Sequence, residues 1–278
     1  MSPMRRLFFR LAFIYPRIYA FFSFYLGKRR KREYEGNVKL FFNEDKDPRG
    51  FRRITRRMFE LKGMRKMQRY LIPHIDHRFI RQSVEMEGLD ILDRALSEKR
   101  GIVLLSAHFG NLGIGLSILR KLGYGVYFLK GGNPEKQRSR NALYVNPPEY
   151  SIYIPKPPVS HRTKEKILET LRSGKIICYT VDSAWGRKKA AVSCFGRTLN
   201  ISTGMVYYAR QANAIVLPFI QLYRRGNIKL MIKEPIDGQW KQGERDYDRV
   251  IEEFAKILES YILAYPDEYY GDIRYLVS

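Results

Sequence analysis

A strand that gives way to a helix at a histidine constrains this 278-residue chain more than any other stretch. Ile102 to Ala107 form a short apolar run, which is typical of a strand buried on both faces of a sheet. From Leu112 onward leucines recur at helical spacing, so a helix is predicted to begin soon after His108. In an open α/β sheet, ligands bind in the crevice outside the carboxyl ends of the strands, and His108 is predicted to lie there.

Two interpretations of His108 stay open. An imidazole titrates near neutral pH, so at the mouth of a buried strand it is suited to general acid or base catalysis. The amide groups at the start of the next helix favour negative charge, and Gly110 and Gly113 leave room for a ligand near the backbone. Alternatively, His108 makes only a local hydrogen bond at the helix start and Gly110 only serves the turn.

Other segments repeat the alternation of strand and helix. Strands are predicted at 84–88, 102–107, 124–129 and 175–181, helices at 89–99, 161–173, 203–214 and 247–264, and a hairpin at 215–232. The proline-rich residues 147–158 are predicted to form an extended loop. The predicted fold class is therefore α/β, with a central mixed, mostly parallel sheet flanked by helices.

Three more charged residues are candidates for the same crevice. Asp182 ends the apolar strand 175–181, so it either faces the crevice or caps the following turn. Arg138 and Arg140 lie on a polar segment predicted to be helical. They either hold a phosphate or the headgroup of a thioester carrier, or they are ordinary surface charge.

The N-terminal segment Leu7 to Leu26 is about long enough to cross a bilayer. Arg10 and Arg17 interrupt it on one helical face, and each costs roughly 2.5–3.5 kcal/mol near the membrane centre. A helix in the membrane interface is therefore favoured over one that spans, and the basic run after it suits anionic headgroups. The alternative is an amphipathic helix packed on the domain. The predicted division is residues 1–32, a membrane-associating helix with a basic flank, and residues 33–278, an α/β domain.

The net charge is +23, from 51 Lys and Arg against 28 Asp and Glu. Such a charge favours anionic partners: nucleic acid, acidic lipid headgroups or an acidic carrier protein. Nucleic acid is the least favoured, because no recognised nucleic-acid module accompanies the basic, aromatic-containing run 49–57. Cys178 and Cys194 are too few for a disulfide framework. His74 and His77 lack further ligands, so no metal site is expected.

Several motifs, taken in order, carry a resemblance to a known family. They are Gly-Ile-Val-Leu-Leu-Ser-Ala-His-Phe-Gly-Asn at 101–111, Leu-Arg-Ser-Gly-Lys-Ile-Ile-Cys-Tyr-Thr-Val-Asp at 171–182, Cys-Phe-Gly-Arg at 194–197, Ala-Ile-Val-Leu-Pro at 214–218 and Tyr-Pro-Asp-Glu-Tyr-Tyr at 265–270. With the N-terminal apolar helix, they resemble the bacterial lipid A biosynthesis acyltransferases, the lauroyl and myristoyl transferases, to which phosphatidylinositol mannoside acyltransferases are similar. The resemblance covers nearly the whole chain and implies a fold of the glycerolipid acyltransferase type.

The resemblance also implies a role for His108. In the family, this histidine begins a His-x4-Asp/Glu motif and acts as general base for an acceptor hydroxyl that attacks an acyl thioester. A carboxylate on the other ring nitrogen holds the tautomer and stabilises the imidazolium. Here the acid position is Gly113. Three alternatives stay open: a carboxylate elsewhere, first of all Asp182, replaces it; His108 acts alone; or the chain has kept the fold and lost the chemistry.

With the resemblance, the expected function is that of a membrane-associated acyltransferase. It would move a fatty acyl group from an acyl thioester, on acyl carrier protein or coenzyme A, to a hydroxyl or amine of a lipid or glycolipid. His108 and Asp182 are the catalytic candidates, and backbone amides at Phe109, Gly110 and Asn111 are expected to receive the thioester oxyanion. No cofactor is expected beyond the thioester co-substrate. The expected location is the cytoplasmic face of the inner membrane. The alternative to the enzyme is a catalytically degenerate family member that acts as a lipid-binding or scaffold protein.

Overall fold

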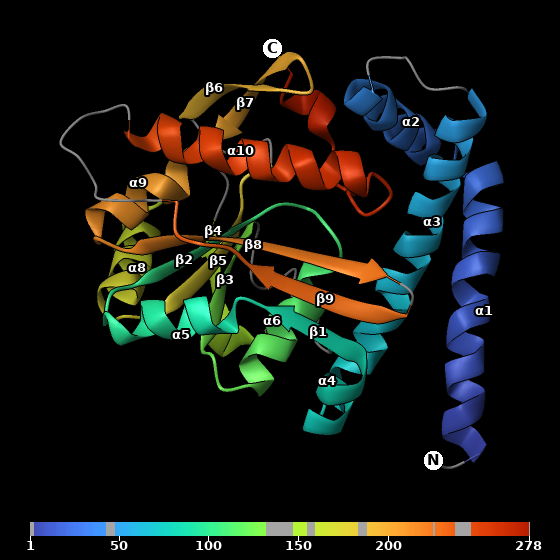
Figure 1. Cartoon of the computed structure of the whole chain (residues 1–278), viewed down its shortest axis with the longest axis horizontal. Coiled ribbons are helices and arrows are strands. Elements are labelled where there is room, and N and C mark those ends of the chain that lie inside the picture. Colours follow the sequence, from blue (N-terminus) through green and yellow to red (C-terminus); the bar gives the residue numbers. More distant parts are fainter. Residues whose placement is uncertain are drawn as a thin grey trace.

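The computed structural model describes residues 3–42, 48–131, 147–154, 159–182, 188–224, 226–236 and 246–277. In this part of the chain, a seven-stranded mixed sheet lies between two layers of helices. A further group of N-terminal helices stands against one end of the sheet (Figure 1). The predicted fold class, α/β with a mixed, mostly parallel sheet flanked by helices, is confirmed.

The main sheet has the strand order β1-β9-β8-β2-β5-β3-β4. Its strands are β1 (Val84–Glu87), β2 (Ile102–Ser106), β3 (Val126–Gly131), β4 (Ser151–Ile154), β5 (Ile176–Thr180), β8 (Ile215–Arg224) and β9 (Asn227–Ile232). Every neighbouring pair is parallel except β8 with β9, which form the predicted hairpin. A second, two-stranded antiparallel sheet pairs β6 (Lys189–Cys194) with β7 (Arg197–Ser202).

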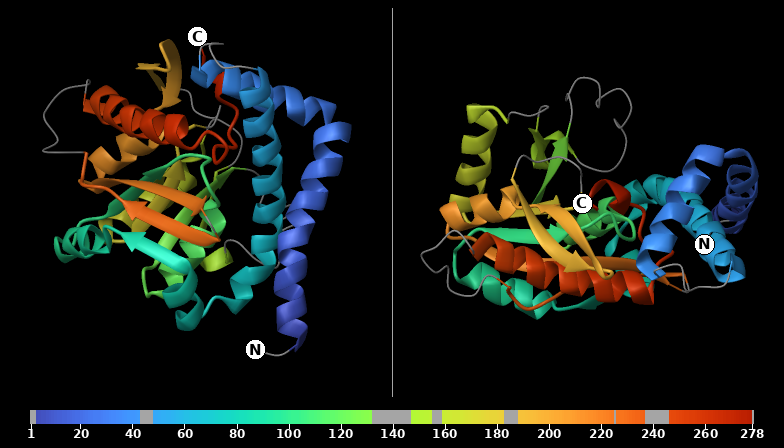
Figure 2. Two further views of the ribbon diagram at one scale, coloured as in Figure 1. Left: turned by 45° about the vertical axis from the view of Figure 1, so that its right-hand side comes forward. Right: turned by 90° about the horizontal axis from the view of Figure 1, so that it is seen from above.

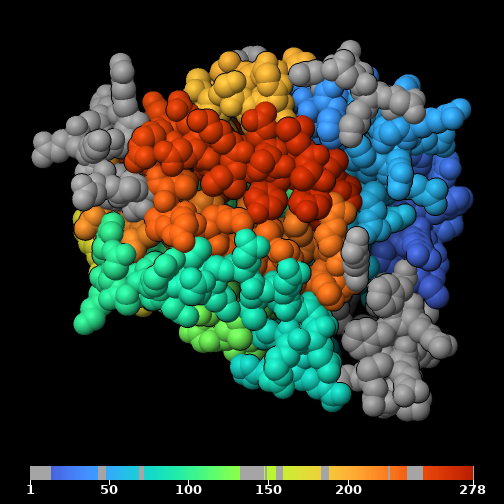
Figure 3. Space-filling model, viewed as in Figure 1, coloured from blue at the N-terminus to red at the C-terminus, as the bar shows by residue number. Residues whose placement is uncertain are grey.

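The central strand β2 requires cover on both faces, because all of its residues are buried and successive side chains point to opposite sides. Ile102 and Leu104 pack in the same cluster as α5 (Leu89–Ser97) and α6 (Leu112–Lys121). Val103 and Leu105 pack in the other cluster, with α8 (His161–Arg172), α9 (Gly204–Gln211) and α10 (Asp246–Ala264). Figure 2 shows these layers from above, and Figure 3 shows α10 lying across the outer face of the molecule.

One predicted loop contains a strand. Residues 151–154 form β4, which pairs with β3 at the edge of the sheet, so the extended loop predicted over 147–158 is wrong in this part. The prolines that suggested a loop flank the strand and do not interrupt its ladder, an arrangement that edge strands tolerate. Residues 155–158 and the predicted helical segment 133–144, which includes Arg138 and Arg140, lie outside the described residues.

The helices before the sheet are α1 (Pro3–Leu26), α2 (Lys28–Phe42), α3 (Pro48–Leu71) and α4 (His77–Ser83), with a short 3-10 turn at Ile72–His74. Helices α1 and α3 lie side by side (Figures 1 and 2). Pro16, Ala20 and Phe24 form the buried stripe of α1. Gly63 of α3 allows a close approach, because a Cβ there would lie 2.9 Å from the Pro16 Cα.

The predicted boundary between residues 32 and 33 falls inside α2, which is continuous across it, and the two-part division stays a prediction. The N-terminal apolar segment is helical as predicted, with Pro16 inside the helix. Within the described residues, no helix has both the length and the apolar character that crossing a bilayer requires.

The basic run 49–57 lies on α3. Phe51 and Ile54 pack against a hydrophobic cluster that includes Phe24 of α1, and Arg57 forms an ion pair with Glu60 at 2.7 Å. Apolar side chains of this run therefore serve helix packing. This arrangement favours the interpretation of the run as a solvated helix face over one as a nucleic-acid site.

Candidate active site

His108 lies at the carboxyl end of β2, in the turn that leads to α6. The turn is tight: the Phe109 amide donates a hydrogen bond of 2.7 Å to the Ala107 carbonyl, and Gly110 has a φ of 62°. A Cβ on Gly110 would lie 2.3 Å from the Gln221 carbonyl oxygen. Glycine is required there, because a side chain would meet both backbone strain and the neighbouring strand.

Asp182 reaches the same place from the neighbouring strand. It follows β5, whose last residue Thr180 pairs with Ser106 of β2. Two contacts join these residues. His108 Nδ1 lies 2.8 Å from Asp182 Oδ1, and the His108 backbone amide donates to Asp182 Oδ2 at 2.9 Å. The structure thus brings together the two catalytic candidates, and the side chain of Asp182 is 1% exposed while that of His108 is 36% exposed.

The pair is electrostatically coupled. Attraction to the Asp182 carboxylate raises the pKa of His108, although burial and the positive charge of Arg65 act in the opposite direction. For Asp182, burial favours the neutral acid, but the charge and hydrogen bonds of His108 outweigh it and lower the pKa overall. With Nδ1 turned to the carboxylate, Nε2 is the ring nitrogen left to exchange a proton with a ligand.

A C-terminal segment, residues 267–271, holds the His108 turn in place. The Tyr270 amide donates to the His108 carbonyl at 2.8 Å, and the Gly110 amide donates to the Glu268 carbonyl at 3.1 Å. The Tyr270 ring stands edge-on to the imidazole, with ring centres 5.4 Å apart. In the sequence, this segment is only part of a motif that carries the family resemblance. No short-range pattern indicates its contact with a turn about 160 residues earlier.

Gly271 closes this segment against the catalytic pair. A Cβ at this position would lie 2.4 Å from the Tyr269 hydroxyl oxygen and 2.6 Å from Asp182 Oδ2. The Tyr269 side chain is fully buried, and its burial is the main cause of a raised Tyr269 pKa. No methyl group fits here unless Asp182 moves.

We therefore predict that Gly271→Ala displaces Asp182 and lowers the activity supported by His108 by about 10²-fold, because small misplacements of catalytic groups are costly. It should also lower the free energy of unfolding by about 1–3 kcal/mol through overpacking. Gly50→Ala on α3 is the matched control, because a Cβ there meets no atom within 4 Å. A Gly271→Ala protein as active and as stable as the control would contradict the prediction.

The structure corrects the predicted oxyanion site. The amides of Phe109 and Gly110 are engaged by the carbonyls of Ala107 and Glu268, so neither is free to bind a ligand as predicted. The Phe109 side chain is buried in the core. Asn111 precedes α6, and its side-chain amide donates to Gln68 Oε1 at 2.7 Å. The binding role of its backbone amide stays a prediction.

Gly113 lies in the buried first turn of α6, where its carbonyl accepts a hydrogen bond from the Ser117 hydroxyl. The carboxylate that meets the imidazole comes instead from Asp182. Of the three alternatives for the missing motif acid, the geometry favours replacement by a carboxylate elsewhere in the crevice. Arg138 and Arg140 lie outside the described residues, and their assignment as substrate-binding residues stays a prediction.

Charged side chains that the sequence analysis did not assign surround the C-terminal segment. Asp267 accepts two hydrogen bonds from Arg224, at 2.8 and 3.0 Å. Glu268 is buried, and this burial raises its pKa to about 7. Arg65 of α3 lies over the Tyr270 ring, with its Cζ 4.3 Å from the ring centre. Their contacts are long-range, so no spacing in the sequence indicates them.

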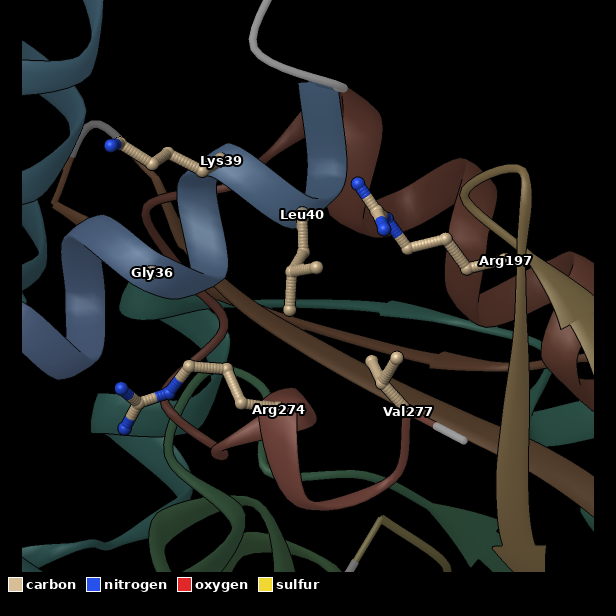
Figure 4. Close-up of a pocket in the computed structure, with 6 residues that line it drawn as sticks. All are labelled: Gly36, Lys39, Leu40, Arg197, Arg274 and Val277. Atoms are coloured by element: carbon tan, nitrogen blue, oxygen red, sulfur yellow. The ribbon is translucent and has the colours of Figure 1, made fainter.

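A basic hollow of about 320 Å³ lies apart from the His108 pair. It is lined by residues of α2, β7 and the C-terminal end: Gly36, Lys39, Leu40, Arg197, Arg274 and Val277. Figure 4 shows Leu40 and Val277 pointing toward each other across it, while the charged ends of Lys39 and Arg274 point away. Asp272 pairs with Arg274 at 2.6 Å, so part of the positive charge of the hollow is compensated.

The described residues contain no group of three His, Cys, Asp or Glu side chains arranged to hold a metal ion. Between His74 and His77, Asp76 serves as the N-cap of α4 and accepts a hydrogen bond of 2.7 Å from the Phe79 amide. This capping bond gives Asp76 a structural role.

Three comparisons relate this chain to known proteins. A family model described as bacterial lipid A biosynthesis acyltransferase matches residues 10–270. The chain is 25% identical over 199 residues to the lipid A biosynthesis lauroyltransferase of Escherichia coli (strain K12), a match that covers 69% of this chain and 61% of that relative. It therefore spans less than two thirds of the relative's length. A solved 1-acyl-sn-glycerophosphate (LPA) acyltransferase, PlsC, from Thermotoga maritima aligns with 95% of this chain and 98% of its own, at 17% identity and a TM-score of 0.43.

Proposed function

The chain belongs to the bacterial lipid A biosynthesis acyltransferase family, and from this membership we propose that it transfers a fatty acyl group from an acyl thioester to a hydroxyl or amine of a lipid or glycolipid. The donor thioester is carried by acyl carrier protein or coenzyme A. One observation carries the proposal: a partly exposed imidazole whose Nδ1 is held 2.8 Å from a buried carboxylate at the carboxyl edge of the sheet.

The pair supports a simple mechanism. Asp182 keeps the proton of His108 on Nδ1, which leaves Nε2 unprotonated and basic. Nε2 takes the proton of the acceptor hydroxyl while its oxygen forms a bond to the thioester carbonyl carbon. The tetrahedral oxyanion then collapses, the carbon–sulfur bond breaks, and the departing thiolate receives the proton from the imidazolium. Asp182 stabilises the positive charge that the imidazole carries between the two steps.

A scaffold protein that binds acyl chains without turnover is the second candidate. The observation that favours it is Gly113, which stands where the family motif has an acid. Asp182 supplies a carboxylate to the imidazole, and for this reason we favour the enzyme.

The decisive experiment compares intact lipids by mass spectrometry from cells with and without this protein, because it reports acceptor and acyl group together. The transferase would be supported if cells without the protein lose one acylated lipid and accumulate a precursor that is lighter by the mass of one acyl group. In a parallel assay, purified protein is offered a panel of acyl carrier protein and acyl-coenzyme A donors. Binding of acyl chains with no turnover of any donor, and no change in cellular lipids, would favour the scaffold.

We also propose that α1 lies in the interface of the inner membrane, at its cytoplasmic face. Over residues 14–26, one stripe of α1 is buried, and large apolar side chains outside that stripe are exposed: Ile14, Tyr15, Ile18, Phe21, Phe22, Tyr25 and Leu26. Lys28, Arg29 and Arg32 follow at the exposed start of α2. An apolar face beside a basic cluster is typical of helices that bind anionic bilayer surfaces.

Replacing two of these side chains with acids, in Ile18→Glu/Phe22→Glu, should weaken binding to vesicles that contain phosphatidylglycerol by at least about 100-fold, because each buried apolar side chain contributes roughly 1.5–3 kcal/mol. Binding is measured by vesicle sedimentation. Leu263→Glu on α10 is the control, because Leu263 is also an exposed apolar residue but lies away from α1. Equal vesicle binding by the double variant and the control would contradict the proposal.

A further inference from the structure

The proposed reaction needs a donor for the oxyanion of the thioester carbonyl, and two of the expected donors are occupied. The Phe109 and Gly110 amides already donate to carbonyl groups within the protein. A negative charge that develops during a reaction is usually stabilised by hydrogen-bond donors that the protein holds in position beforehand. A further donor is therefore expected near His108.

Arg65 is such a donor. Its Nη1 atom is buried and has no hydrogen-bond partner in the part of the chain that the structure describes. A guanidinium has five N–H donors and no acceptor, and leaving one of them buried and unpaired costs free energy. A buried donor that no protein group satisfies is a position where the oxygen of a ligand or of water can bind.

Tyr270 holds Arg65 beside the catalytic histidine. The Arg65 Cζ lies 4.3 Å from the centre of the Tyr270 ring, and the same ring stands edge-on to the imidazole of His108 with centres 5.4 Å apart. The Tyr270 backbone is itself fixed by its hydrogen bond to the His108 carbonyl. The guanidinium and the imidazole thus share one rigid neighbour.

The buried acid Glu268 has other partners and does not accept a hydrogen bond from Arg65 Nη1. Glu268 Oε1 accepts a hydrogen bond from the Tyr223 amide at 3.0 Å and lies 3.8 Å from Arg224 Nε. The positive charge of Arg65 contributes to a lower pKa of both Glu268 and His108, which places it in the electrostatic field of the site. Its charge is felt by both groups, while its Nη1 donor remains available.

We propose that Arg65 is a catalytic residue whose Nη1 donates a hydrogen bond to the oxyanion formed on the thioester carbonyl when the acceptor attacks. This inference rests on the acyl transfer proposed above. Attack converts the carbonyl oxygen to an anion, Arg65 stabilises that anion without giving up a proton, and the charge returns to the carbonyl as the carbon–sulfur bond breaks.

The test is a split between kcat and KM, measured with the donor and acceptor that the lipid analysis identifies. Arg65→Met should lower kcat by about 10²- to 10³-fold, the usual effect of removing one oxyanion donor, with KM for the donor nearly unchanged. Arg65→Lys should recover at least about tenfold of that loss, because a cation with N–H donors is restored. Arg56→Met is the matched control, since Arg56 lies exposed on the same helix.

A second measurement does not depend on turnover. Dodecylphosphonate carries a tetrahedral anionic headgroup on an alkyl chain, and its binding by calorimetry should weaken at least about tenfold in Arg65→Met but not in Arg56→Met. Unchanged kcat, a rise in KM alone, or equal phosphonate binding by both variants would overturn the role of Arg65. A wild-type protein that transfers no acyl group at all would instead count against the proposed function.

Discussion

Replacing His108 by alanine is expected to lower kcat for acyl transfer by about 10²- to 10⁴-fold, the range attributed to a positioned general base. The imidazole lies at the carboxyl end of β2, with its Nδ1 2.8 Å from a carboxylate oxygen of Asp182. Its side chain is 36% exposed, so a substrate can reach it. Without it, the proposed reaction lacks its general base. The rate is measured by incorporation of labelled acyl chains into extracted lipid.

The controls separate chemistry from folding. His161→Ala removes a histidine whose side chain is 89% exposed at the start of α8, and it should leave the rate unchanged. The His108→Ala protein should bind vesicles as the wild type does, because the hydrogen bond that joins this position to the C-terminal segment is made by backbone atoms. A His108→Ala protein that keeps more than about a tenth of the rate would exclude the histidine as the general base.

Asp182→Asn is expected to lower kcat to a similar extent, by about 10³- to 10⁴-fold, because an amide facing Nδ1 no longer fixes the tautomer or compensates the imidazolium. Asparagine keeps the shape of the buried aspartate, so melting temperature and vesicle binding report whether the fold survives. Asp272→Asn is the matched control: this acid pairs with Arg274 near the C-terminal end and has no contact with His108 among the described residues.

The pH dependence gives an independent test of the same pair. Asp182 raises the pKa of His108 above its ordinary value of about 6.5. A general base works when neutral, so kcat/KM of the wild type should rise with pH through a midpoint above that value. In Asp182→Asn the attraction is gone while burial and Arg65 still lower the pKa, so the midpoint should move to lower pH. A midpoint that stays in place would contradict the coupling.

Local patterns were sufficient for much of the fold. The apolar run after Gly101 and the leucines after His108 correctly predicted β2 and α6, and the same reasoning predicted α8, α10 and the β8–β9 hairpin. These patterns are readable because burial imposes a period on neighbouring residues. The strand at 151–154 was missed, because an edge strand between prolines is defined by its pairing with β3 and not by its own composition.

The candidate site divides in the same way. His108 and Asp182 were identified because each ends a buried strand, and parallel strands that are neighbours in a sheet bring their carboxyl ends together. That β2 and β5 are neighbours is a matter of strand order, which the sequence alone did not specify. The oxyanion donors were assigned wrongly at Phe109 and Gly110, because whether an amide is free depends on which carbonyl lies opposite it.

Composition and periodicity alone thus predicted an α/β chain with an amphipathic N-terminal helix, a basic surface and ionisable residues at strand ends. Each of these features depends on composition or on residues that are close together in the sequence. Packing between distant segments decided the chemistry of the site. It set the 2.8 Å contact between residues 74 positions apart, engaged the Gly110 amide with Glu268, and left the Nη1 of Arg65 without a partner among the described residues. Hydrogen bonds are short and directional, so their presence or absence follows from three-dimensional positions that no local pattern encodes.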